Sequence, residues 1–521
     1  MSARPPAGAA APPPLEGVER AVGAFVLSLA VFMTVLDTTI ANVSIPTIAG
    51  DLGVSPSQGT WVITSFAVST AIAVPLTGWL VVRFGQVRLF VTSVLLFSTA
   101  SWLCGLAPNL ETLIVFRVLQ GLVAGPMVPL SQAMLLSTFP REKAGLALAL
   151  WSMTALLAPI SGPLLGGWIS DNATWPWIFY INVPVGLFSA AVTWQLYRTR
   201  DSATRKVPVD YVGLGLLVIW VAALQIMLDK GNELDWFSSP QIVALGCVAL
   251  AGFTLFLVWE LVDNEHPIVD LSLFKSRNFT SGTLAIAVGY AVFFGITVII
   301  PLWLQTIMGY TAFLSGLTVA PIGILSLIIA PFLGRALPHL DARKIASAAF
   351  LVFALVMFMR ARFDLQTDFW SIVLPTFIQG AATVSFFLPL TALLLAGLPP
   401  ERIPAATGLS NFARFTAGAF GASVSVTMWN DRTALHRAHL VEHVTDYSPH
   451  AQDALAAMHA RGLPTQQAMG LMDHLIDQQA RMLGTIDLFW LSGFLFIALT
   501  ALVWLAKPTN VSHAPADAGA H

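Results

Sequence analysis

The chain has 521 residues, of which 56% are hydrophobic and only 10% are charged, and its formal net charge is −2. Soluble domains carry about 25% charged residues, so this composition excludes an ordinary soluble domain and indicates a multi-pass membrane protein. The small net charge offers no basic field for nucleic acid. The two cysteines, Cys104 and Cys247, fall in apolar stretches, which argues against a disulfide framework or a zinc site.

Residues 1–20 are rich in Ala and Pro and are expected to form a disordered cytoplasmic tail. Apolar stretches long enough to cross a bilayer follow, and the first is too long for the apolar core of a cleavable signal. We expect fourteen spans, near 22–44, 60–82, 87–107, 111–136, 145–169, 176–197, 209–228, 241–262, 281–305, 313–334, 344–361, 369–397, 404–428 and 485–506. Basic residues concentrate in the segments on the N-terminal side of the membrane, so the positive-inside rule predicts that both termini are cytoplasmic.

Asp37, in the first span, is the only acidic residue away from the ends of any expected span. A carboxylate at membrane depth costs about 2.5–3.5 kcal/mol on insertion scales, so it indicates a functional site. Counting residues along each helix puts Arg117, in the fourth span, at a similar depth. A nearby arginine favours the charged carboxylate and apolar burial favours the neutral acid, so the pair predicts a site that takes up and releases a proton. The alternative is a structural ion pair, which apolar packing can often replace.

The short segment between the second and third spans holds Gly78, Arg83, Gly85 and Arg88. Glycine permits a tight turn, and the arginines would lie at the inner membrane surface. We expect a conformational element here, although a gating role and a plain topogenic turn have the same sequence.

The fifth span carries a dense set of helix-bending and small residues: Pro159, Gly162, Pro163, Gly166 and Gly167. Proline kinks a helix, and small residues let two helices approach closely. The pattern therefore predicts a bending element beside the path between two bundles, or simply close helix packing.

Polar and aromatic residues within spans are candidates for a substrate cavity: Asn42, Trp61, Phe66, Trp151, Tyr290, Phe294, Phe387, Asn411 and Phe415. Arg414, near mid-membrane in the thirteenth span, could face this cavity or neutralise carbonyl groups at a kink. Away from the span ends, Arg117 and Arg414 stand against Asp37 alone. We therefore predict neutral, anionic or singly cationic lipophiles as substrates in preference to dications.

The outer loop from about Trp429 to Gly484 holds six of the ten histidines. His436, His439 and His443 share one helical face, a spacing that is compatible with a metal site. No cysteine or dense carboxylate cluster supports it, and a solvated helical face explains the spacing. Apolar residues recur at helical spacing on either side of Gly462, which predicts a short helical hairpin. This hairpin is a candidate docking surface for a periplasmic partner.

An internal repeat indicates two bundles. Residues 75–78 (PLTG) are followed by the basic residue Arg88, and residues 331–334 (PFLG) are followed at the same spacing by the basic residue Lys344. The pair Gln120 and Gly121 likewise recurs at 379–380. Both copies enter the membrane in the same direction, which is typical of repeats related by an axis along the membrane normal. We expect an all-α membrane protein with a six-helix bundle over 21–200, two inserted transmembrane helices over 201–280, a six-helix bundle over 281–506 that includes the periplasmic loop 429–484, and a cytoplasmic tail over 507–521.

These motifs resemble those of a known family. Residues 36–46 (LDTTIANVSIP) resemble the first-span signature of the fourteen-span drug:proton antiporters of the major facilitator superfamily. Arg117 with Gln120 and Gly121 resembles the superfamily's fourth-span motif, and 159–167 resembles its antiporter motif. Residues 58–66, 235–239 and 267–279 and the long outer loop are similar to the EmrB-type multidrug efflux pumps of the EmrB/QacA family.

The resemblance implies a major facilitator fold, with Asp37 as the proton-coupling acid and Arg117 as its modulator. It also implies a Gram-negative inner membrane, an EmrA-type periplasmic adaptor and a TolC-type outer-membrane channel. One departure concerns the segment between spans 2 and 3. The family usually has an acid at the position of Val82 and basic residues at those of Gln86 and Val87, so the charge-based latch assigned to this segment is altered here.

The sequence has no phosphate-binding loop, nucleophile elbow or metal-ligand spacing, so no enzyme activity, cofactor or metal is expected. We predict a proton-coupled antiporter that exports lipophilic drugs across the inner membrane as the pump of a tripartite efflux system, by alternating access between the two bundles. The alternatives are a dedicated proton-driven exporter of an endogenous metabolite or siderophore, and a non-transporting scaffold, which would have no need of Asp37.

Overall fold

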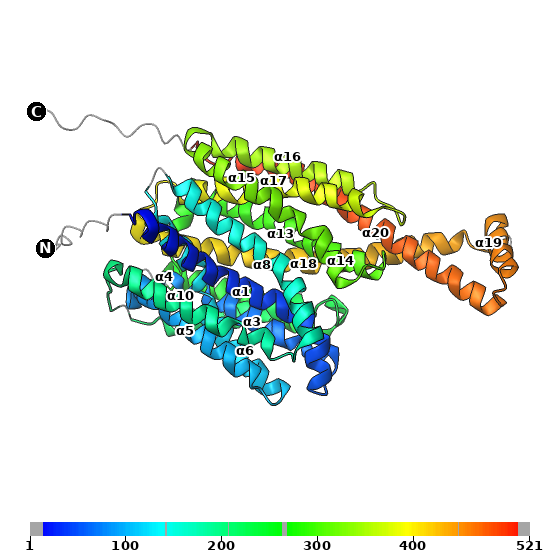
Figure 1. Ribbon diagram of the computed structural model, residues 1–521, viewed down its shortest axis with the longest axis horizontal. Helices are drawn as coiled ribbons and strands as arrows, with labels where there is room; N and C mark the ends of the chain where they lie inside the picture. Colours follow the sequence, from blue (N-terminus) through cyan, green and yellow to red (C-terminus); the bar gives the residue numbers. More distant parts are fainter. Residues whose placement is uncertain (1–13, 141–142, 207, 263–267, 446–447, 509–521) are drawn as a thin grey trace, which may run out of the picture.

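The computed structural model describes residues 14–508 except 141–142, 207, 263–267 and 446–447, and the described chain is helical throughout its regular elements (Figure 1). The first part comprises α1 (Gly17–Asp51), α2 (Pro56–Gly59), α3 (Trp61–Ala73), α4 (Thr77–Phe84), α5 (Gln86–Gly105), α6 (Leu110–Ala124), α7 (Met127–Thr138), α8 (Ala144–Asn172), α9 (Trp177–Tyr180) and α10 (Asn182–Tyr197). Two helices follow, α11 (Tyr211–Lys230) and α12 (Pro240–Val262). The last part comprises α13 (Arg277–Thr306), α14 (Ala312–Val319), α15 (Pro321–Ala336), α16 (Ala342–Arg360), α17 (Phe369–Leu395), α18 (Ile403–Glu442), α19 (Pro449–Ala460) and α20 (Thr465–Val503).

Membrane-length segments account for most of the described chain. Eleven segments of the described chain are long and apolar enough to span a bilayer, and the number is twelve if α3 and α4, bent by 62° at a short break, are counted as one span. The remaining expected spans, 145–169 and 404–428, correspond to α8 and α18, which are 29 and 40 residues long. The helices are therefore consistent with the expected fourteen spans. The first helix begins at Gly17, so residues 17–20 are helical and do not belong to the expected disordered tail.

Several long helices begin at a polar side chain that accepts hydrogen bonds from their free N–H groups. Asn109 accepts from the amide of Thr112 at the start of α6, and Asp210 accepts from two amides at the start of α11. Asp341 and Asp368 act in the same way for α16 and α17. These caps satisfy groups that would otherwise be costly at a helix end, so the sequence itself defines where these spans start.

The helices form two bundles with the pair α11–α12 beside them. In the first bundle α1 packs against α8 and α10, and α3 packs against α6; in the second, α13 packs against α18, and α17 packs against α15 and α16. The repeat seen in the sequence has a structural counterpart. A Cβ at Gly121 would overlap Ser69 of α3, and one at Gly380 would overlap the backbone of Ile322 in α15. Each glycine thus lets the fourth span of its bundle approach the second.

The two bundles touch at the end of the molecule where the described chain begins and ends, here called the terminal end (Figure 1). A Cβ at Gly145 of α8 would overlap the carbonyl oxygen of Gly334 in α15. A Cβ at Gly78 in α4 would lie 2.7 Å from that of Ala405 in α18. Glycine at positions 78 and 145 permits these approaches, and these contacts close the terminal end.

The opposite end is extended by α18 and α20, which project beyond the bundles and carry α19 at their tip; this is the hairpin end (Figure 1). The helices α18 and α20 therefore contribute much of the stretch 429–484, and the expected hairpin turns at Gly462, whose φ of 85° suits glycine. His436 Nε2 lies 2.8 Å from Asp487 Oδ2, which joins α18 to α20. No group of three metal-ligating side chains occurs in the described part of the chain.

Candidate functional site

Asp37 and Arg117 form a fully buried ion pair between α1 and α6. Arg117 Nη1 donates to Asp37 Oδ2 over 2.6 Å, and neither side chain is exposed. The contact expected from counting residues along the two helices is therefore present. Removing either partner would leave an uncompensated buried charge, which costs far more than losing an exposed ion pair.

Two amide side chains and a hydroxyl complete the surroundings of the carboxylate. Gln120 Nε2 and Asn182 Nδ2 donate to Asp37 Oδ1 over 3.1 and 2.8 Å. The same two amides also donate to Ser101 Oγ, over 3.0 and 2.9 Å. Arg117 Nη1 further donates to Gln120 Oε1 over 2.7 Å. The charge on one carboxylate thus connects α1, α5, α6 and α10.

The guanidinium of Arg117 is held from its other side by α3. Its Nε donates to the carbonyl oxygen of Val62 over 2.9 Å, and the Phe66 ring centroid lies 4.2 Å from its central carbon. Phe66, expected in the substrate cavity, is therefore placed against the ion pair. Nη2 of Arg117 is buried and has no hydrogen-bond partner among the described residues. We name Asp37, Ser101, Arg117, Gln120 and Asn182 the carboxylate network.

The segment between α4 and α5 is held by an acid that the sequence analysis did not select. Gly85 adopts a φ of 88°, and Asp201 Oδ1 accepts from the amide of Val87 over 2.8 Å. Arg88 lies 3.4 Å from the same carboxylate, and Val82 accepts from the amide of Arg205 over 2.8 Å. Asp201 thus supplies a carboxylate at this turn although position 82 has none. The signal was available, because Asp201 interrupts a basic stretch directly after the sixth span.

The remaining residues of this segment lie at the surface or between the bundles. Arg83 is exposed and lies over the ring of Trp79, 5.4 Å from its centroid. Gly78 is the residue that lets α4 approach α18.

In α8, the glycine positions pack against α1. A Cβ at Gly162 would overlap Thr39, and one at Gly166 would lie 3.3 Å from the Cα of Ile40. Pro159, Pro163 and Gly167 belong to the residues of α8 whose side chains the structure does not describe. The described glycines therefore support the close-packing interpretation of this motif, and α8 also contacts α15 of the second bundle.

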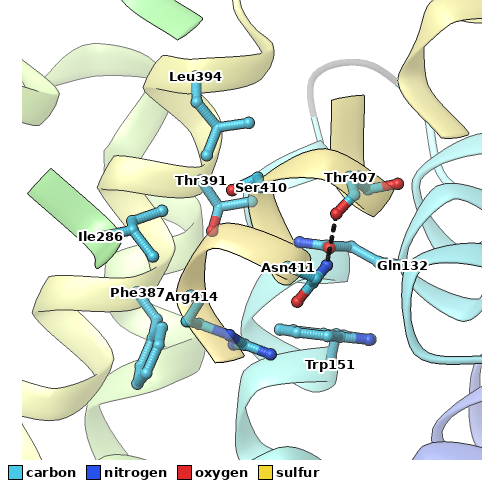
Figure 2. Close-up of a pocket in the computed structure, with 10 residues that line it drawn as sticks. All are labelled: Gln132, Trp151, Ile286, Phe387, Thr391, Leu394, Thr407, Ser410, Asn411 and Arg414. Carbon is cyan, nitrogen blue, oxygen red and sulfur yellow. Dashed lines mark hydrogen bonds between the residues drawn. The ribbon is translucent and has the colours of Figure 1, made fainter. Parts of the chain in front are cut away.

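A small cavity lies between the bundles (Figure 2). Its volume of about 10 Å³ is enough for about one water molecule, so the bundles are closed around it. Gln132 of α7 and Trp151 of α8 form one side, and residues of α13, α17 and α18 form the other: Ile286, Phe387, Thr391, Leu394, Thr407, Ser410, Asn411 and Arg414. Asn411 Nδ2 donates to Gln132 Oε1 over 3.2 Å, which joins the two bundles directly.

Among the described residues that line this cavity, Arg414 is the only charged one. It extends from α18 towards Trp151 (Figure 2), and its central carbon lies 4.7–5.7 Å from the ring centroids of Trp151, Tyr290, Phe387 and Phe415. Its Nε is buried without a hydrogen-bond partner, and no carboxylate in the described chain lies within ion-pair distance of it. This is a buried cation in an aromatic surround that lacks a counter-ion.

The other expected cavity residues are distributed differently. Phe294 stacks on Tyr290 with 5.5 Å between centroids, so it lies behind the residues that contact Arg414. Trp61 lies under Lys230 Nζ, 5.4 Å away, at the contact between α3 and the inserted helix α11. Asn42 is exposed on α1. In this closed arrangement these three residues do not line the cavity.

Comparison with known proteins identifies the family. The model of the Major Facilitator Superfamily matches residues 27–422. The multidrug export protein EmrB of Escherichia coli (strain K12) is 50% identical over 496 residues, which cover 95% of this chain and 97% of that protein. The chain belongs to the EmrB-type efflux pumps of the Major Facilitator Superfamily. It is accordingly a drug efflux transporter of that superfamily.

Other relatives extend this picture. The fatty acid resistance protein FarB of Neisseria gonorrhoeae is 48% identical over 95% of this chain and 98% of its own length. Among solved structures, the proton:xylose symporter XylE superposes with a TM-score of 0.60 at 13% identity, covering 94% of this chain and 95% of that one. The human organic anion transporter MFSD10 superposes with a TM-score of 0.56 at 13% identity, covering 94% of this chain and all of that one. At such identities the structural likeness establishes the fold alone.

Proposed function

We propose that this transporter is a proton-coupled antiporter that exports lipophilic compounds, with Asp37 as the coupling acid. The observation that carries the proposal is the carboxylate network, which gathers four polar side chains around one acid within the membrane-spanning region. Protonation would remove the negative charge to which Arg117, Gln120 and Asn182 donate. The contacts that join α1 to α6 and α10 would weaken, so proton uptake would change how these helices pack.

Proton and substrate would be coupled through helix movement. The carboxylate network and the cavity share no residue, but α1 packs directly against α7 and α8, which carry Gln132 and Trp151. A shift of α1 on protonation would therefore displace α7 and α8, and with them the cavity residues Gln132 and Trp151. One proton moving down roughly 100 mV and one pH unit releases about 3.7 kcal/mol, which is enough for a drug gradient of a few hundred-fold.

The substrate site is proposed to be the cavity around Arg414. Aromatic rings and a lone buried guanidinium suit a lipophile that is neutral or carries a negative charge, whereas a dication would meet a like charge. One relative is named for fatty acid resistance, and this name is compatible with substrates that are acids with an apolar tail. A dedicated exporter of one such endogenous acid is the second candidate, and a narrow substrate range in a transport screen would favour it.

Membership of the family supports a proposal for the cellular setting. We place the chain in a Gram-negative inner membrane with both termini in the cytoplasm, so the hairpin end would be periplasmic. The projecting part of α18–α20 would then meet an EmrA-type adaptor that connects to a TolC-type outer-membrane channel. The length of the projection and its exposed surface support this arrangement.

Flux measurements in proteoliposomes test the coupling. With an imposed pH gradient, the parent should move a lipophilic drug and protons in opposite directions, and Asp37→Asn should lose the coupled flux while still binding drug. Asp51→Asn is the matched control, since Asp51 is an exposed acid at the end of the same helix, and its flux should equal that of the parent. Coupled flux that persists in Asp37→Asn would exclude Asp37 as the coupling acid.

A further inference from the structure

A second, larger hollow lies on the outside of the first bundle, between α1, α8 and the α9–α10 pair. Its volume is about 550 Å³, and we call it the lateral groove. Leu29 and Leu36 of α1, Ile169 of α8 and Val185 of α10 are among its lining residues. Among the described lining residues, Asn182 is the only one that is neither aliphatic, aromatic nor a thioether. The groove is thus an apolar surface that reaches the carboxylate network at a single residue.

The lateral groove opens in the half of the membrane at the hairpin end. Its lining runs from Leu29, twelve residues into α1, to Ala173, the residue that follows α8. Trp168 and Trp177 line it near that end and are 64% and 54% exposed. Tryptophan is enriched where the hydrocarbon core meets the headgroups. The groove therefore extends from about the headgroup level towards the middle of the bilayer.

The chemistry of the groove determines what can fill it. Water needs two to four polar partners, and the described part of the lining offers one polar side chain, the amide of Asn182, which is already hydrogen-bonded to Asp37 and Ser101. A volume of this size is in the range of pockets that hold a small ligand. The surrounding medium at this depth consists of hydrocarbon chains. We propose that the lateral groove is a binding site for one acyl chain of a phospholipid in the leaflet at the hairpin end.

Such a chain would lie directly behind the coupling acid. Asn182 touches both the groove and Asp37 Oδ1, and Leu36 is the chain neighbour of Asp37. A bound acyl chain would keep water from reaching the carboxylate network through the side of the bundle. This consequence rests on the proposed role of Asp37, whereas the binding site itself does not.

Photolabelling of the full chain tests the binding site. The parent is reconstituted in vesicles that contain a phospholipid with a diazirine in one acyl chain, and adducts are mapped by mass spectrometry. Groove residues over 29–36, 165–173 and 181–185 should be labelled more strongly than Val243 and Val248, exposed apolar residues of α12. Equal labelling of the groove and of α12 in the parent would overturn the proposal, and this comparison needs no variant.

A filled groove provides the second measurement. Val185→Trp should remove most of the groove adducts, whereas the matched substitution Val248→Trp on α12 should leave them unchanged. Adducts that persist in Val185→Trp would contradict the site. Free palmitate that suppresses groove labelling when present during irradiation would overturn the assignment to a phospholipid. Because the readout is lipid labelling, its failure is distinct from failure of proton coupling.

Discussion

Replacement of Arg414 by methionine should separate acidic from neutral substrates. Met keeps most of the apolar contact with the four surrounding rings but removes the one charge among the described residues that line the cavity. Arg414→Met should therefore weaken binding of a lipophilic carboxylic acid and leave binding of its primary amide nearly unchanged.

The expected loss of affinity for the acid follows from the missing hydrogen-bond partner and counter-ion of Arg414. Its Nε has no partner and no carboxylate lies near it in the described chain, so a bound carboxylate would gain a hydrogen bond that nothing in the protein already makes. A hydrogen bond to a charged group contributes about 1.5–3 kcal/mol, so the acid should lose roughly 10- to 150-fold in affinity. The free-energy cost of opening the nearly closed cavity is the same for both ligands, so this cost cancels in the ratio of acid to amide affinity.

Equilibrium binding to the purified full chain, at a pH where the acid is ionised, gives this ratio. Arg360→Met is the matched control, because Arg360 is also a buried arginine but lies in α16 and does not line the cavity. The ratio of acid to amide affinity in this variant should equal that of the parent. An equal loss for acid and amide in Arg414→Met would show a packing role, and no loss for either would place the substrate elsewhere.

Four further outcomes are expected. Asp37→Leu and Arg117→Met should each lower the free energy of unfolding by about 3–5 kcal/mol, and the double variant by less than their sum; additive losses in a double-mutant cycle would mean the pair does not interact. Gly145→Val should open the terminal end, which a rise in thiol labelling of engineered cysteines there would detect and unchanged labelling would refute. Asp201→Ala should weaken the cap on α5 by about 0.5–2 kcal/mol, seen as faster hydrogen exchange at its first amides. Hydrogen bonds from Arg343 hold the pKa of Asp341 below its ordinary value. The ionised Asp341 should therefore contribute a small amount of stability at neutral pH, and this contribution should be lost as the pH falls through the lowered pKa. Asp341→Asn should remove this acid dependence of the melting temperature.

The ion pair of Asp37 and Arg117 could be predicted from the sequence, but only part of the carboxylate network around it could. Asp37 and Arg117 could be matched because helix rise converts residue number into depth, and a charge at that depth needs a partner. Asn182 was missed since a neutral amide near the end of a span costs little and so gives no signal. Its role depends on α10 packing against both α1 and α5, a tertiary contact that spacing along one helix does not contain.

The cavity shows the same limit. Trp151, Phe387, Asn411 and Arg414 were selected for polarity or aromatic character and do line it, while Asn42 and Trp61 have the same character and do not. Residue type establishes that a side chain could bind a lipophile. Which helix face turns towards the other bundle depends on the packing of α13, α17 and α18, and that information is distributed over the whole interface.

The tie between Asp201 and the turn around Gly85 has a practical consequence. Residues 201–205 are fixed to the α4–α5 turn by several contacts. Asp201 and Ser202 accept from the amides of Val87 and Gln86, and the amide of Arg205 donates to Val82. They also begin the segment that leads to α11. A fluorophore attached at Ala203, which is exposed within that stretch, would report movement of the turn in real time without altering the cavity around Arg414 or the carboxylate network.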